Sequence, residues 1–419
     1  MKRTIGILML VVLVGLFPLV SYAKTVIDFW NLFTGPDGKI MESMVKEFNA
    51  SQDEVEVRMQ ILPWGDPYYN KLLLSIQTGT APDVAICHDW NLPIFAKYGR
   101  LFPMSPKTLE KGGVNKGDFM EYPLTAGKYQ GVTYGLPLDV HPYALYYNVD
   151  HLKAAGIDPN KVILNKENLL DAAKKLQVKD DKGQVTRWGF MPTMHGSIWR
   201  EWYTFLNQFG GTYLTKDSTK AAFNSEAGAK ALQFFVDLQN DGLIPPTLTD
   251  AATPFRTSKC SMTIAGTWMI PGFDEQKDLN YMIVPFPQIG QKKAAWSASH
   301  LLVLPKKKSR DKLDAATKLV EWLTAHQIEW SAKAGHCPTR KSVIASDAFK
   351  KLIKQQAFVA ELGYLVWQPH VEQATSIESR SGQELNAVYN KQKTVTQALK
   401  DLETFVNDIL TRPVGEVGK

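Results

Sequence analysis

The chain has 419 residues, of which 44% are hydrophobic and 21% charged, and a formal net charge of +6. This length exceeds what one hydrophobic core usually supports, so two lobes are expected, and the ordinary composition excludes disordered and fibrous proteins. The charges are interspersed, apart from a lysine run at 306–308 that fits a solvated turn, so nucleic acid is not an expected partner.

The first 23 residues have the pattern of a cleaved export signal. Lys2 and Arg3 precede an uncharged apolar run at 5–20, and small residues lead to Ala23. The run is shorter than the ~20 residues of a membrane-spanning helix, and no cysteine follows it for a lipid anchor. We therefore expect cleavage near Ala23 and a soluble protein of the periplasm.

The next part of the chain alternates predicted strands and helices. Strands are predicted at 26–30, at 55–61, where apolar and polar residues alternate, and at 84–87. Apolar spacing predicts helices around 41–48 and 72–76. Right-handed crossovers turn this order into a parallel sheet covered on both faces, with ligands beyond the carboxyl ends of its strands.

A second segment also combines predicted strands and helices. It contains a predicted strand at 144–147, helices at 169–176, 198–209 and 225–241, and a strand from Met262. Stretches bounded by proline, at 135–137, 284–287 and 335–338, are the expected crossings between the two lobes.

Several side chains follow the strands of the first segment and are candidates for ligand binding. Asp89 is the favoured carboxylate, and its alternative role is a helix N-cap. Trp64 could bind a ligand or pack, and Thr34 and Gly35 could offer a hydroxyl and backbone N–H groups. These candidates, with the neighbouring histidine, are Thr34, Gly35, Trp64, His88 and Asp89.

Tryptophans are the most distinctive residues of the second segment. Trp268 follows Gly266 at the end of a short apolar strand, where a backbone can approach a ligand closely. Trp199 and Trp202, spaced three residues apart on a predicted helix, are further candidates for ligand contact, although such a stripe is more often core than binding surface. We therefore rank Trp268 first as an aromatic contact.

Four motifs together resemble the extracellular solute-binding proteins of bacterial ABC sugar importers, in their maltose-binding-like group. They are Pro-Asp-Val (82–84), Gly-Leu-Pro-Leu-Asp-Val-His-Pro (135–142), Ile-Ala-Gly-Thr-Trp (264–268) and Gly-His-Cys-Pro-Thr-Arg (335–340). The resemblance implies a two-lobed α/β periplasmic binding protein fold of class II, in which each lobe is a mainly parallel sheet flanked by helices. It places 24–134 plus 286–335 in the N-lobe and 135–285 plus 336–419 in the C-lobe.

The same resemblance implies a carbohydrate ligand and further site residues. Asp89 would accept hydrogen bonds from sugar hydroxyls, and Asp139 and His141 would lie at the first crossing. Arg340 would face the cleft, and its alternative role is a salt bridge that pins the hinge. His141 stands alone in sequence, so we expect no metal site and no cofactor. The implied partner is an inner-membrane ABC permease, and a monomer is expected.

Catalytic motifs are missing from the sequence, which has no Gly-x-Ser-x-Gly elbow, His-Glu-x-x-His or phosphate-binding glycine loop. A glycosidase needs only two carboxylates brought together in space, which sequence spacing does not exclude. It is the family resemblance that implies a binding protein and no enzyme. The alternatives are a glycerol phosphodiester, for which Arg200 and Arg340 are the available cations, a polyamine, and, in a different class, a secreted glycoside hydrolase.

The chain contains three cysteines, Cys87, Cys260 and Cys337, without metal-ligand spacing. Export permits one disulfide between Cys260 and Cys337, and buried free thiols are the alternative.

Overall fold

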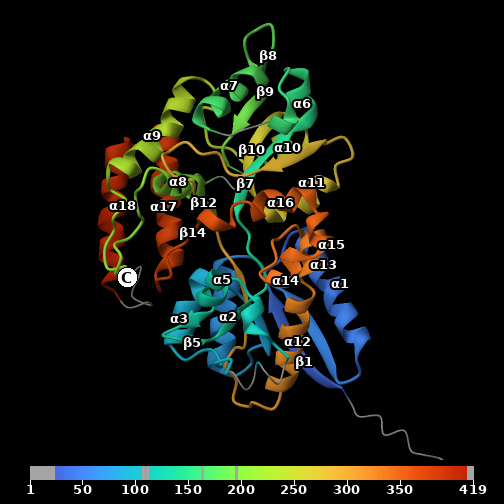
Figure 1. Cartoon of the computed structure of the whole chain (residues 1–419). Helices are drawn as coiled ribbons and strands as arrows, with labels where there is room; N and C mark the ends of the chain where they lie inside the picture. Colours follow the sequence, from blue (N-terminus) through green and yellow to red (C-terminus); the bar gives the residue numbers. More distant parts are fainter. Residues whose placement is uncertain (1–23, 106–108, 110–112, 162–164, 194–196, 413–419) are drawn as a thin grey trace, which may run out of the picture.

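The computed structural model describes residues 24–105, 109, 113–161, 165–193 and 197–412. The expected export signal at 1–23 lies outside these residues. The described chain forms two α/β lobes, the lower one in Figure 1 built largely from the blue and cyan part of the chain and the upper one from the green and yellow part. No helix of the described chain is long and apolar enough to cross a membrane.

The sheet of the first lobe has five strands in the order β2-β1-β3-β13-β6. β1 is parallel to β2 and β3, whereas β13 is antiparallel to both β3 and β6. The predicted alternation in β2 holds, since Val55 and Val57 are buried. The strands are β1 (Thr25–Asn31), β2 (Val55–Ile61), β3 (Val84–His88), β6 (Gly135–Pro137) and β13 (His300–Val303).

Helices cover this sheet by burying one apolar stripe each. In α1 the stripe is the predicted set at Met41, Met44, Val45 and Phe48, all of which are buried. The helices of this lobe are α1 (Pro36–Ser51), α2 (Asp66–Thr78), α3 (Leu92–Lys97), α5 (Glu121–Ala126), α12 (Leu313–Ala325) and α13 (Gln327–Ala334). Short elements of this lobe are η1 (Asp89–Asn91), η2 (Lys116–Asp118), β4 (Lys128–Tyr129) and β5 (Val132–Thr133).

The sheet of the second lobe has the order β11-β7-β10-β9-β8. Only the β10–β9 pair is parallel, so both sheets are mixed, not mainly parallel as expected. Two causes combine: β7 and β13, each the first strand after the chain changes lobes, run antiparallel to their neighbours, and β8 pairs antiparallel with β9, the next strand along the chain. The strands are β7 (Tyr143–Asn148), β8 (Val178–Lys179), β9 (Val185–Met191), β10 (Cys260–Gly266) and β11 (Tyr281–Val284).

The C-terminal helices α17 and α18 pack beside α8 and α9, at the left of Figure 1, as the family resemblance implied. The helices of the second lobe are α6 (Val149–Ala154), α7 (Lys166–Leu176), α8 (Trp199–Gln208), α9 (Glu226–Asn240), α10 (Ala252–Arg256), α11 (Ile270–Asp274), α16 (Ile353–Val359), α17 (Ala374–Tyr389) and α18 (Val395–Leu410). Two short helices, α14 (Lys341–Ala345) and α15 (Asp347–Lys350), follow α13, and short 3-10 turns are η3 (Pro159–Lys161), η4 (Thr267–Met269) and η5 (Leu362–Tyr364).

The chain passes between the lobes at 138–142 and 298–299. The segment 335–340 pairs with the first of these passages through Val140 and Cys337, and we call it the third crossing. After it the chain still contacts the first lobe through Ser342 and α15, before α16 packs on β11 of the second lobe. β6 lies in the first sheet, just after the expected bound at 134. Phe286 lies in the core of the second lobe, where its backbone N–H donates to Glu361. The small sheet of β12 (Ala295–Ser297) and β14 (Leu365–Trp367) keeps the chain beside α8 until the second crossing. The expected domain bounds stay a prediction.

All three cysteines are buried and free, so Cys260 and Cys337 are not bonded to each other. Burial raises the pKa of the Cys260 thiol to about 12 and that of Cys337 well above its usual value. Such thiols stay protonated and act as small apolar side chains.

Candidate functional site

A cavity of about 790 Å³ lies between the two lobes and is lined by residues of both. This volume is within the range of small-molecule binding sites. The first lobe contributes the turn after β1, the turn before α2 and the end of β3. The second lobe contributes η4, the start of α8 and one face of α17, while the crossings form part of the wall.

Aromatic rings from both lobes face this cavity. Trp64 is 53% exposed and belongs to the first lobe. Trp268 belongs to the second, with its ring edge-on to His141 at a centroid distance of 5.7 Å. Such flat apolar faces can cover C–H surfaces of a ligand from two sides. The aromatic lining residues are Phe33, Trp64, Tyr69, Trp90, Trp268 and Trp296.

The charged groups of the cavity nearly balance. Arg200 forms an ion pair with Glu378, and its guanidinium lies 4.7 Å from the ring centroid of Trp296. Burial raises the pKa of Asp37, an effect that the charge of His300 partly offsets. The lining contains two arginines, Arg200 and Arg256, and three carboxyl groups, Asp37, Asp66 and Glu378.

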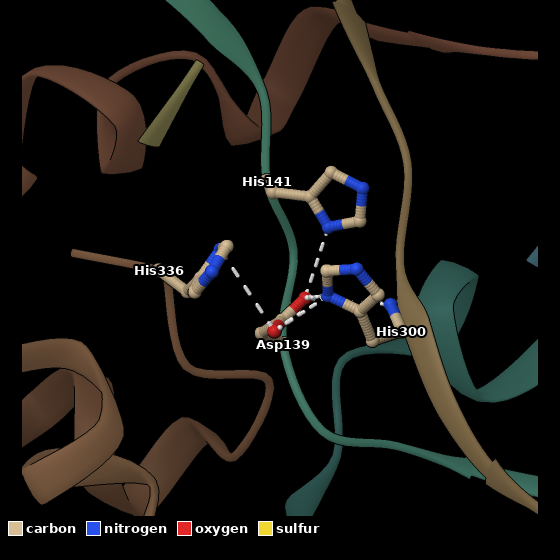
Figure 2. A group of neighbouring side chains, drawn as sticks. All are labelled: Asp139, His141, His300 and His336. Atoms are coloured by element: carbon tan, nitrogen blue, oxygen red, sulfur yellow. Dashed lines mark hydrogen bonds and ion pairs between the residues drawn. The ribbon is translucent and has the colours of Figure 1, made fainter. Parts of the chain in front are cut away.

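A buried carboxylate with three imidazoles around it lies at the crossings (Figure 2). Asp139 Oδ1 is 3.0 Å from Nδ1 of His141, and Asp139 Oδ2 is 2.9 Å from Nδ1 of His300. His336 Nδ1 lies 3.9 Å from Asp139 Oδ2. Burial opposes ionisation of Asp139, but the nearby His300 and hydrogen bonds from His141 and His300 hold its pKa well below the usual range.

The neighbouring histidines favour their neutral forms. Burial, reinforced by the nearby His300, lowers the pKa of His141 to about 4 and that of His88 well below its usual value. Burial also lowers the pKa of His336 to about 3, although the charge of Asp139 opposes this. Neutral imidazoles offer the cavity wall both hydrogen-bond donors and acceptors.

Six of the sequence-predicted residues line the cavity: Thr34, Gly35, Trp64, His88, His141 and Trp268. They come from the carboxyl ends of β1 and β3, the turn before α2, the first crossing and the end of β10. That they contact a ligand stays a prediction.

Three further candidates lie behind this lining. Asp89 is fully buried, accepts a hydrogen bond from the backbone of Ser299 and contacts His370 Nε2 at 3.1 Å. His88, and not Asp89, is the N-cap residue of η1, whereas the Asp89 carboxylate contacts Ser299 and His370. Asp139 holds the imidazoles, and Gly266 lies beneath the indole that follows it.

Trp199, Trp202 and Arg340 lie away from the cavity lining. Trp199 and Trp202 are buried in the core of the second lobe, where the indole of Trp202 donates to Gly228 O. Arg340 pairs with Glu321 at 2.8 Å, which matches the alternative role of a salt bridge at the third crossing. The apolar stripe of α8 therefore points inward.

Other lining residues were not singled out from the sequence. Trp296 and His300 flank the second crossing, and Arg256 ends α10. His336 could have been identified as a lining residue from the sequence, because it lies in the Gly-His-Cys-Pro-Thr-Arg motif of the third crossing. Trp90 directly follows Asp89, at a predicted strand end.

The lobes also touch beside the cavity, through side chains of α3, η1 and α5 on one lobe and of the segment from β14 to α17 on the other. Tyr122 stacks on Trp367 with ring centroids 4.1 Å apart and planes 20° from parallel. The polar contacts are Lys97–Glu372, Tyr98–Glu372, Asp89–His370 and Asn91–Thr375. We call this set of contacts the interlobe latch.

Comparison with known proteins identifies a family. A family model described as bacterial extracellular solute-binding protein matches residues 43–357. The chain is similar to a binding protein of Brucella abortus strain 2308, with 24% identity over 396 residues that cover 91% of this chain and 92% of that protein. It is also 22% identical to the sn-glycerol-3-phosphate-binding periplasmic protein UgpB of Escherichia coli K12, over 77% of this chain and 76% of that one.

Solved structures share the two-lobed fold. An ABC transporter solute-binding protein of Thermotoga lettingae, bound with α-D-tagatose, superimposes with a TM-score of 0.79 and 26% identity, covering 92% of this chain and 100% of that one. An ABC substrate-binding protein of Listeria monocytogenes, in complex with cycloalternan, gives a TM-score of 0.80 at 22% identity, covering 92% and 99%, and shows likeness of fold alone.

Proposed function

The chain belongs to the bacterial extracellular solute-binding protein family, and we propose that it captures a mono- or oligosaccharide between its lobes for an inner-membrane ABC permease. The observation that carries this proposal is the cavity lining, in which aromatic faces from both lobes stand beside carboxyl and amide groups. A sugar needs both, because its hydroxyls seek hydrogen bonds and its C–H faces seek apolar cover.

The balance of charge favours a neutral ligand over an anionic one. A glycerol phosphodiester would need an excess of cationic groups, but Arg200 is already paired with Glu378. Arg340, the other cation considered for this ligand, is bound to Glu321 outside the cavity. Arg256 remains in the lining together with Asp37 and other carboxyl groups. Because the chain is similar to UgpB, glycerol phosphates and their diesters are among the ligands to be tested.

The relatives support the transport role. The family is one of binding proteins, and the Thermotoga lettingae structure, an ABC transporter component, holds a sugar. In this role the protein carries out no reaction, works as a periplasmic monomer and releases the sugar to the permease. A secreted glycoside hydrolase would instead turn its ligand over.

Isothermal titration against a panel tests the proposal. The panel contains mono- and oligosaccharides, glycerol 3-phosphate and its diesters, and polyamines, and each mixture is then analysed for products. We expect one class of saccharide to bind with 1:1 stoichiometry and to be recovered intact. Binding of only the phosphate compounds or only the polyamines, or hydrolysis of the bound sugar, would overturn the proposal.

A further inference from the structure

The three crossings between the lobes run side by side and are hydrogen-bonded to one another. Val140 on the first crossing exchanges two backbone hydrogen bonds with Cys337 on the third, at 2.9 and 3.0 Å. The backbone N–H of His141 donates to Ala298 O on the second crossing at 2.9 Å. Side chains from three distant parts of the sequence are therefore held together at one point.

Four side chains with metal-ligand chemistry meet at this point, and we call them the crossing cluster: Asp139, His141, His300 and His336. One donor atom from each lies within 4.8 Å of those of all the others, and all four residues are buried. Figure 2 shows three imidazole rings arranged around the single carboxylate, with His141 and His300 stacked at 4.2 Å.

We propose that the crossing cluster binds one divalent transition-metal ion, with Zn²⁺ the best match, through the Asp139 carboxylate and the three imidazoles. Three histidines and one carboxylate are a donor set suited to such ions, whereas Mg²⁺ and Ca²⁺ prefer oxygen ligands. This site is independent of which solute occupies the cavity.

The spacing of the donors is close to what a tetrahedral ion requires. Bonds of about 2.0 to 2.2 Å at tetrahedral angles place neighbouring ligand atoms about 3.3 Å apart. The Nδ1 atoms of His141 and His300 lie 3.0 and 2.9 Å from Asp139 oxygens, and His336 Nδ1 lies 3.9 Å away. These three distances lie on either side of that value, and all four donor atoms lie within 4.8 Å of one another.

The groups around the cluster also resemble those of a metal site. The Trp330 indole donates to Asp139 Oδ2 at 2.8 Å, which fixes the carboxylate. His336 Nδ1 is 2.9 Å from Thr267 Oγ1, whereas its Nε2 is buried and has no hydrogen-bond partner among the described residues. An outer donor such as the Trp330 indole orients a ligand at metal centres. The unsatisfied nitrogen shows that the hydrogen-bond network alone does not saturate the cluster.

A bound ion would connect all three crossings at the wall of the cavity. His141, His300 and His336 line the cavity, so the ion would lie next to the bound solute. Asp139 and His141 belong to the first crossing and His336 to the third, and His300 begins β13 directly after the second.

The test is titration of tag-free protein, first treated with chelator, with Zn²⁺ by calorimetry and with Co²⁺ by visible absorption. We expect one ion per chain, a Co²⁺ spectrum typical of tetrahedral nitrogen and oxygen ligation, and a rise in Tm with Zn²⁺ that chelator reverses. Absence of saturable 1:1 binding, or an octahedral water-like Co²⁺ spectrum, would overturn the proposal.

Variants locate the ion. Asp139→Asn and His336→Gln keep the size of the side chain, and each should weaken Zn²⁺ binding at least about 100-fold. Trp330→Phe removes the indole donor to Asp139, keeps an aromatic ring beside His336 and Phe33, and should weaken Zn²⁺ binding by about 10- to 100-fold. The control is His151→Gln on α6, where the native ring contacts Ser261. If a cluster variant fails to fold, the Zn²⁺ affinity of Trp330→Phe is the deciding measurement. Unchanged Zn²⁺ affinity in every folded cluster variant would contradict the assignment.

Discussion

The indole of Trp268 lies directly against the backbone of Gly266, so that a Cβ atom at 266 would be 2.1 Å from Cζ3 of the ring. Gly266 ends β10, and the following turn η4 brings the ring back over it and beside the cavity. The missing side chain of the glycine thus determines where the indole lies.

Replacement of Trp268 by alanine should weaken solute binding by about 30- to 1000-fold, because a stacked ring and its buried area contribute roughly 2 to 4 kcal/mol. Calorimetry with the bound saccharide measures this. The control is Trp188→Ala on β9 of the same lobe, an indole that packs away from the cavity lining. Affinity within threefold of the native value, in a folded variant, would refute the contact.

Gly266→Ala should produce a weaker version of the same defect. The added methyl group displaces the ring of Trp268, which can move because it belongs to a partly exposed side chain. We expect at least about a tenfold loss of solute affinity, corresponding to about 1.4 kcal/mol. Combining it with Trp268→Ala should add little, since both changes act on one ring. Fully additive effects in the double variant would show that the glycine acts elsewhere.

The interlobe latch should favour the closed arrangement of the lobes. Tyr122→Ala removes the stack on Trp367, and such aromatic pairs contribute about 0.5 to 1.5 kcal/mol. Because the latch forms only when the lobes meet, solute affinity should fall by about 2- to 12-fold. Small-angle scattering of the variant without solute should also show a larger radius of gyration.

Tyr129→Ala, on β4 of the same lobe, is the matched control for the latch and should leave both quantities unchanged. Scattering curves that superimpose for native protein and Tyr122→Ala, together with equal solute affinity, would mean that the latch does not contribute to closure.

Glu201 on α8 should make stability depend on pH. Burial raises the pKa of its carboxyl group from 4.5 to about 8, and its own backbone N–H and the charge of Arg200 offset only part of this. The unfolded chain loses this proton near pH 4.5, whereas the folded chain keeps it until about pH 8. The stabilising effect of the retained proton is therefore complete below the lower value and is lost as the pH rises through this window.

Chemical denaturation of native protein and Glu201→Gln at several pH values measures the effect. As the pH rises from 4.5 to about 8, the free energy of unfolding of the native protein should fall, relative to the variant, by on the order of 3 to 5 kcal/mol. Parallel curves for the two proteins would show that Glu201 is ionised in the folded state.

Local patterns predicted the elements well. Alternation at 55–61 and the apolar spacing of 41–48 are properties of neighbouring residues, and both match β2 and α1. The turn at Trp268 was also recognisable, because a glycine and a strand end mark it locally. Spacing alone did not separate core from lining at Trp199 and Trp202, because an inward and a cavity-facing stripe have the same period.

The cluster around Asp139 depends on contacts that no local pattern contains. His141 stood alone in sequence, and the crossings bring His300 and His336 to it from distant segments. Likewise, the carboxylate of Asp89 was recognisable as a strand-end group, but its contact with His370 depends on how the lobes meet. The antiparallel direction of β7 and β13 follows from the crossings too, and these are not visible as strand periodicity.

Native mass spectrometry of gently purified protein, with identification of the retained small molecule, tests the central claim most directly. We expect a 1:1 complex whose released ligand has the mass and fragmentation of a hexose or a short hexose oligomer. Trp268→Ala should lose this ligand, and Trp188→Ala should keep it. A released ligand that is a phosphodiester or a polyamine, or a saccharide retained equally by both variants, would contradict the central claim.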